Sequence, residues 1–332
     1  MAESPDLYSP SGKSGNSLLL TPLACLPLTA IAALIYGYIC VYNPLVGYVS
    51  ILLPLGYGAA IGYCLKGSLK ISKCRNPGVA AVLSAGVIAF AIYCAWTCFI
   101  FALLDRNASA ASPSPTLIRI FTSPAATFNF MCSLASTGWF SIGSGTPSGV
   151  VLWLFWIAEA GMIAYVAMIA PLEFTKQTVF CEDCDTWCDA KNDLSRYVPP
   201  SGDAEKKARI ERGDLTVVAD LTPSSSRMAN QYLRLDSQRC KQCNETSTFQ
   251  LSRITITVDK NGKRQEKVEK QTGLVMLTPD SLALLQEALA RKAAAAPPEV
   301  AAPAPKLPMR KPPLLQKKKI SSKGNDGESV DA

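Results

Sequence analysis

Four long apolar segments constrain the fold of this chain more than any other feature. Residues 23–42, 45–65, 79–104 and 150–172 contain no Asp, Glu, Lys or Arg except Glu159. A helix needs roughly 20 predominantly apolar residues to cross the hydrocarbon core of a bilayer. The sequence therefore predicts an α-helical membrane domain over residues 23–172, with four transmembrane helices in the lipid bilayer. Residues 1–22 are then an N-terminal cytosolic tail.

The charges of the loops predict how these helices are oriented. The 66–78 loop carries four basic residues and no acid, whereas the longer 105–149 connection carries only three charged residues. Because Lys and Arg in short loops mark the cytoplasmic side of a membrane protein, both termini are expected in the cytoplasm. Within the external connection, residues 116–137 are apolar enough to lie along the membrane surface, and Pro124 argues against one continuous helix there.

Two cysteine pairs of identical spacing follow the last apolar segment. Cys181 and Cys184 form one Cys-x-x-Cys pair, and Cys240 and Cys243 form the second. Two such pairs can supply four thiolates to one tetrahedral ion, and cysteines in a reducing cytosol are more often metal ligands than disulfides. We therefore expect a structural zinc, with Cys188 as an alternative ligand. Iron in the same four thiolates is less favoured, although ligand identity alone does not separate it from zinc.

The residues around these cysteines predict a small β-rich domain. The expected strands are at 231–236, 249–258 and 264–277, with a hairpin turn at Asn261-Gly262 and a bulge near Arg253, where the apolar alternation changes parity. The expected helices are at 203–212 and from Thr278-Pro279-Asp280 to about residue 293. A sheet of this size has too little core to fold reliably without a structural metal. Residues 173–293 are therefore predicted to form a zinc-ribbon-like cytosolic domain.

The end of the chain, residues 294–332, is Ala/Pro-rich and then basic. Because such a segment lacks the bulky apolar residues of a packed core, a disordered tail is expected. Its basic residues are either solvated or in contact with anionic lipid of the inner leaflet. Nucleic acid is a disfavoured partner, since no aromatic residues are interleaved with the basic ones.

The absence of histidine excludes several kinds of catalytic chemistry. The chain contains no histidine, which removes Ser-His and Cys-His nucleophile pairs and His-ligated haem.

Glu159 is an ionisable residue near the middle of the last apolar segment. It is either a packing residue hydrogen-bonded to a neighbouring helix or part of a proton or cation path. The structural explanation is favoured, because transporters usually show internal repeats and more spans.

Several short motifs are distributed over roughly residues 23–280. They are Tyr42-Asn43-Pro44-Leu45, the glycines Gly56, Gly58 and Gly62, Arg75-Asn76, Trp153-x-x-Trp156-x-x-Glu159 and Phe180-Cys181-x-x-Cys184. In these motifs the chain resembles a family of uncharacterised bacterial four-helix membrane proteins with a C-terminal Cys-x-x-Cys domain. The resemblance implies the same architecture in the bacterial cytoplasmic (inner) membrane, and it implies no activity.

Three functions are compatible with these features. The first is a membrane-anchored, non-enzymatic zinc-ribbon interaction or scaffold module that contacts a cytosolic protein. The second is a small transporter or channel that uses Glu159 and is regulated by the ribbon. The third is membrane-bound electron transfer through a thiolate-iron centre. An enzyme is not favoured, because no nucleophile–base pair can be identified.

Overall fold

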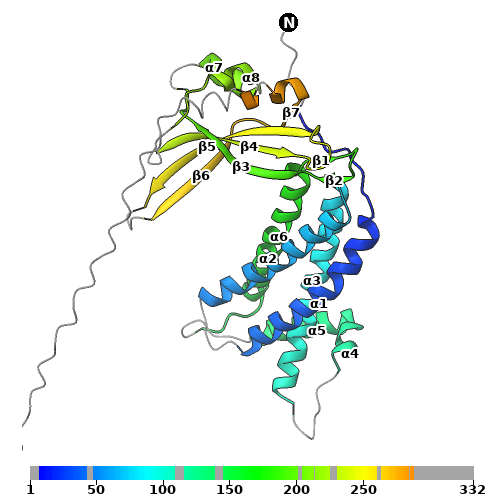
Figure 1. The fold of residues 1–332 in the computed structure, drawn as a ribbon. Coiled ribbons are helices and arrows are strands. Elements are labelled where there is room, and N and C mark those ends of the chain that lie inside the picture. Colours follow the sequence, from blue (N-terminus) through cyan, green and yellow to red (C-terminus); the bar gives the residue numbers. More distant parts are fainter. Residues whose placement is uncertain are drawn as a thin grey trace, which may run out of the picture.

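A helical bundle stands against one side of a twisted β-sheet (Figure 1). This computed structural model describes residues 7–42, 48–108, 116–138, 145–200, 204–212, 214–224, 230–259, 263–283 and 285–287. The predicted tail at 294–332 and the predicted turn at Asn261-Gly262 lie outside the described residues.

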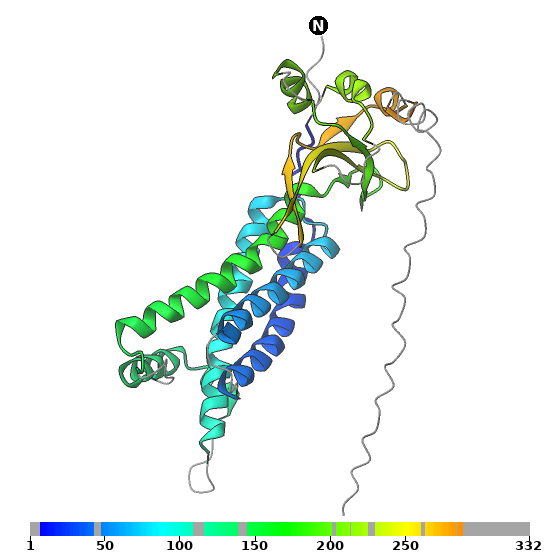
Figure 2. The ribbon, with the colours of Figure 1, turned by 90° about the vertical axis from the view of Figure 1, so that its left-hand side faces the viewer.

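Long helices form the bundle, and two short ones lie across its far end (Figure 2). The helices are α1 (Ser17–Tyr42), α2 (Tyr48–Ile71), α3 (Pro77–Arg106), α4 (Leu117–Phe121), α5 (Pro124–Thr137) and α6 (Val150–Gln177). Among the described residues, α1, α3 and α6 are long and apolar enough to cross a membrane. The predicted second span at 45–65 falls largely on α2, which is not one of these three helices. As expected, Pro124 separates two helices within 116–137, because it occupies the first turn of α5.

The long helices pack mainly in two pairs, α1 against α3 and α2 against α6. Two glycines one turn apart allow the backbones of α2 and α6 to approach closely. A Cβ atom at Gly58 would lie 2.8 Å from the carbonyl oxygen of Ile163, and one at Gly62 would lie 2.9 Å from that of Ala167. Small residues at this spacing are a common means of helix association in membranes. The two glycines therefore set the position of α6 on α2.

The N-terminal segment from Leu7 to Asn16 is bound to both parts of the molecule and is not a free tail. The Tyr8 amide donates to the Leu274 carbonyl at 2.8 Å, next to the last strand of the sheet. Farther along, the Arg75 amide donates to the Lys13 carbonyl at 2.8 Å, in the loop between α2 and α3. This segment therefore joins the sheet to the bundle.

The described residues that follow α6 form seven strands and the short helices α7 and α8, and residues 279–283 and 285–287 are also helical, within the helix predicted after Thr278. The labelled elements are β1 (Phe180–Cys181), β2 (Thr186–Trp187), β3 (Asp189–Tyr197), α7 (Ala204–Glu211), α8 (Leu215–Asp220), β4 (Gln231–Arg239), β5 (Ser247–Val258), β6 (Arg264–Lys270) and β7 (Val275–Leu277). β1 and β2 form a hairpin of their own, and the main antiparallel sheet has the order β3-β4-β5-β6, with β7 also paired to β5. α7 and α8 cover one face of the sheet, where Val218, Phe249 and Leu251 are fully buried.

The predicted strands at 231–236 and 249–258 are confirmed, the predicted strand at 264–277 is divided into β6 and β7, and the predicted bulge near Arg253 is wrong. Arg253 pairs with Leu233 on β4 and with Glu269 on β6 in an unbroken register. The parity of the apolar residues changes because β5 is buried on both faces: Leu251 belongs to the core under α7 and α8, and Ile254 is buried on the opposite face. The irregularity of the sheet lies instead in β3, between residues 191 and 195.

Glycine substitutions on α2 test this packing. Gly62→Ala is expected to destabilise the protein by about 1–3 kcal/mol, because the new methyl group meets the backbone of α6. Gly56→Ala on the same helix is the matched control, since nothing lies within 4 Å of the added Cβ there. It should be neutral or stabilising by up to about 1 kcal/mol, the difference in helix propensity. Melting temperatures of the full-length variants in detergent measure the effect, and equal shifts would contradict the proposed role of Gly62.

Candidate metal centre

Each cysteine pair lies in a hairpin turn. Cys181 ends β1 and Cys184 lies in the turn to β2, while Cys240 and Cys243 lie in the turn between β4 and β5. In both turns the residue after the second cysteine has a left-handed backbone, with φ of 50° at Asp185 and 60° at Asn244. Asp and Asn adopt this conformation more readily than other residues that carry a Cβ. The two turns therefore resemble each other in local backbone conformation as well as in cysteine spacing.

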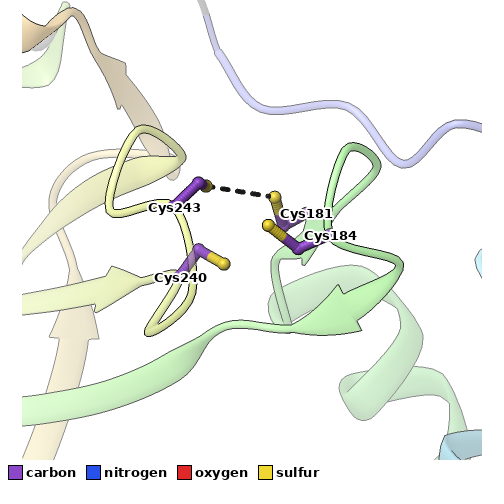
Figure 3. A group of neighbouring side chains, drawn as sticks. All are labelled: Cys181, Cys184, Cys240 and Cys243. Atoms are coloured by element: carbon purple, nitrogen blue, oxygen red, sulfur yellow. Dashed lines mark hydrogen bonds between the residues drawn. The ribbon is translucent and has the colours of Figure 1, made fainter.

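The four sulfur atoms of Cys181, Cys184, Cys240 and Cys243 converge, as the sequence predicted. All four lie within 4.8 Å of one another, and Cys181 Sγ and Cys243 Sγ are 3.6 Å apart (Figure 3). A tetrahedral zinc with Zn–S bonds of about 2.3 Å requires sulfur–sulfur separations of about 3.8 Å. The cluster therefore has the size and donor set of a single tetrahedral thiolate site.

The cluster is buried on one side. Cys181 and Cys240 are fully buried, with Tyr8, Val179 and Leu274 packed around them, while Cys184 and Cys243 are half-buried. An ion bound by all four sulfurs would have no coordination position left for a substrate. Such closure is typical of structural metal sites.

Hydrogen-bond donors are directed at two of the sulfurs. The Glu245 amide lies 3.4 Å from Cys243 Sγ, and the Thr246 hydroxyl lies 3.2 Å from Cys181 Sγ. The backbone amides of Thr246 and Glu245 lower the pKa of the Cys243 thiol to about 6. Because a thiolate is the form that binds a metal, these donors favour ligation.

Cys188, the alternative ligand, lies beside the cluster but is not one of the four converging sulfurs. It is 5% exposed and packs with Val179 and Cys240. Burial, followed by the nearby Cys240 and Cys181, raises the pKa of its thiol to about 12. Its environment is therefore that of a small buried neutral group.

The first turn also docks onto the loop between α2 and α3. The Arg75 guanidinium lies 2.9 Å from a carboxylate oxygen of Glu182 and 4.1 Å from the centre of the Phe180 ring. Trp187 of β2 donates its indole N–H to the Lys70 carbonyl at 2.9 Å, and Lys73 pairs with Asp185. The turn that carries Cys181 and Cys184 is therefore a direct contact between the metal centre and the helical bundle.

The N-terminal segment completes this contact. Lys13 binds the same Glu182 oxygen as Arg75, also at 2.9 Å. Partial burial alone would raise the pKa of Glu182, but hydrogen bonds from Ser11 and Lys13 and the charge of Arg75 hold it below its ordinary value. Glu182 is therefore a carboxylate shared by two basic residues from different segments.

Sequence reasoning missed this docking surface. Its one local signal is the pair of aromatic residues, Phe180 and Trp187, that flank the first cysteine pair. Nothing local marks Tyr8, Lys13 or Arg75, because their partners are 100 or more residues away along the chain.

Glu159 is not part of the metal centre. It lies on α6, 18 residues before the end of that helix, which corresponds to roughly 27 Å along the axis. Its carboxylate accepts a hydrogen bond from the Tyr36 hydroxyl of α1. This contact agrees with the structural explanation for the residue.

Comparison of the chain with protein-family models, curated proteins and solved structures yields no match. Functional conclusions therefore rest on the geometry of the chain itself.

Substitution of the two basic residues that share Glu182 tests the docking surface. Arg75→Gln is expected to destabilise the protein by about 1–3 kcal/mol, because the Arg75 side chain is only 8% exposed and stacks on Phe180. Lys13→Gln should cost no more than about 1 kcal/mol, because Lys13 is 63% exposed. Thermal unfolding of both full-length variants measures the difference, and equal losses would show that burial of Arg75 is unimportant.

Proposed function

We propose that this protein is a membrane-anchored, non-enzymatic interaction module whose cytosolic zinc-ribbon domain is organised by one structural zinc ion. The convergence of four cysteine sulfurs within 4.8 Å carries the proposal. The domain presents a metal-stabilised sheet to a cytosolic protein partner at a fixed position against the membrane helices.

The chemistry of the cluster favours a structural ion over a catalytic one. Four sulfur donors saturate a tetrahedral zinc, so no open position remains for a bound water or a substrate. β1 and β2 have two residues each. A hairpin that short is not stable alone, and a shared metal ion would supply the missing stabilisation.

The positions of three segments beside the sheet support four membrane crossings, with α2 as the fourth crossing helix. The N-terminal segment contacts the sheet through Tyr8, the loop between α2 and α3 contacts it through Arg75, and α6 leads directly into it. These three points lie on one side of the membrane only if α1, α2, α3 and α6 all cross. With the basic 66–78 loop inside, the proposed location is the bacterial cytoplasmic membrane with both termini in the cytoplasm.

Metal analysis of the purified full-length protein tests the zinc site. The protein is expected to be colourless and to contain about one zinc ion per chain. Serine at Cys181, Cys184, Cys240 or Cys243 should abolish zinc retention and lower the melting temperature, because the remaining sulfurs cannot complete the site. Cys188→Ser is the matched control, a buried cysteine outside the cluster, and it should retain zinc.

Two outcomes would contradict the proposal. If the purified protein is coloured and contains iron, the cysteine cluster is a thiolate-iron centre and the zinc proposal is wrong. Full folding without any bound metal, unchanged in all four serine variants, would remove the metal from the function.

Labelling of engineered cysteines from outside the cell tests the crossings. In a Cys132→Ser background, Asn107→Cys should react with a membrane-impermeant maleimide in intact cells, because it follows α3 on the external side. Ser9→Cys and Lys70→Cys should react only after the membrane is permeabilised. Reaction of Lys70→Cys but not Ser9→Cys in intact cells would contradict the crossing of α2, and reaction of both would contradict the orientation.

A further inference from the structure

A cavity of about 60 Å³ lies between α1, α3 and α6. Its lining is mainly apolar and aromatic, and Glu159 of α6 and Tyr36 of α1 belong to it. One water molecule needs roughly 10–15 Å³ of such cavity volume, so this cavity has room for more than one water molecule. The cavity is therefore large enough for a small polar group of a ligand.

Glu159 gives this cavity a charge preference. The four apolar segments contain no Lys or Arg, so no basic side chain within them pairs with this carboxylate. The hydrogen bond from Tyr36 satisfies part of its acceptor capacity without supplying a positive charge. A carboxyl group at this depth is costly in its charged form unless a cation is near it, and otherwise stays protonated. A positive group is therefore the counterpart that the charged form of Glu159 requires and that the four apolar segments do not supply.

Aromatic rings line the same cavity as this carboxylate. Trp96, Phe99 and Trp156 all line the cavity. The Trp96 ring lies 4.8 Å from that of Trp156 and 5.7 Å from that of Phe99, in both cases edge to face. Ring faces attract organic cations electrostatically, and Trp does so most strongly. These rings and the carboxylate therefore favour the same kind of ligand.

The donor set disfavours a metal cation. Hard cations such as Ca²⁺ and Mg²⁺ take six or more oxygen ligands. The described lining offers the carboxylate of Glu159 and the hydroxyl of Tyr36 as side-chain oxygens. An alkylammonium group needs only one carboxylate and ring faces, and its chain gains by burial against apolar residues.

We infer that this cavity is a binding site for an alkylammonium cation, with the charged head between Glu159, Trp96 and Trp156 and the alkyl chain along the apolar helix surfaces. The site is independent of the metal centre. It also gives the intramembrane carboxylate a ligand-binding role in addition to its contact with Tyr36.

Titration calorimetry on the zinc-loaded full-length protein in lipid nanodiscs tests the inference, with empty nanodiscs subtracted. Hexyltrimethylammonium is expected to bind saturably, whereas hexyl sulfate, with the same chain and the opposite charge, should not bind. Glu159→Gln should weaken binding of the cation by about tenfold or more, because it removes the charge and keeps an acceptor for Tyr36. Glu173→Gln, the same substitution near the end of α6 and outside this cavity, should leave binding unchanged.

A second variant keeps the test decisive if Glu159→Gln does not fold. Trp96→Leu keeps an apolar wall but removes a ring face, and it should weaken binding of the cation while zinc content stays that of the native protein. Loss of its ring contacts with Phe99 and Trp156 should also lower the melting temperature, so folding of the variant is checked before binding is measured. Absence of saturable binding to the native protein, equal binding of hexyl sulfate, or undiminished binding of the cation by the folded variants would each overturn the inference. Zinc content is measured separately, so failure here is distinguishable from failure of the metal proposal.

Discussion

The convergence of four sulfur atoms is the constraint on which the part of this protein after α6 depends. Two hairpin turns, 55 residues apart along the chain, must meet at one point for Cys181 and Cys184 to lie beside Cys240 and Cys243. The turn between β4 and β5 belongs to a well-packed sheet with its own core. The β1–β2 hairpin has no comparable core, so its position depends on contacts at its two sides.

Those two sides connect different parts of the molecule. On one side the hairpin contributes two sulfurs to the metal centre. On the other, Phe180 and Glu182 meet Arg75 in the loop between α2 and α3, and Trp187 bonds to the carbonyl of Lys70. Separation of the four sulfurs would thus loosen the sheet and its attachment to the helices together. The proposed metal ion would act at this point of linkage, where the proposed interaction domain meets the helices.

In the helical bundle, close packing and a cavity occur at the same level of α6. Gly58 and Gly62 bring α2 and α6 together at backbone distance beside Ile163 and Ala167, and the cavity between α1, α3 and α6 is lined by Ile163 as well as by Glu159. The proposed ligand-binding role of Glu159 depends on this cavity, because a carboxylate enclosed by packed helices would have no room for a ligand.

The features that the sequence by itself determined are local ones. The length of the apolar segments predicted membrane helices, the repeated Cys-x-x-Cys spacing predicted four ligands, and the composition of 231–277 predicted strands. Each depends on residues that are close along the chain, where periodicity and spacing are informative. The tertiary structure alone decided that residues 7–16 bind the sheet, that Arg75 is buried against Phe180, that both faces of β5 are covered near Ile254, and that Tyr36 meets Glu159. These contacts join segments that are far apart in sequence, and no local pattern records which distant surface a side chain will meet.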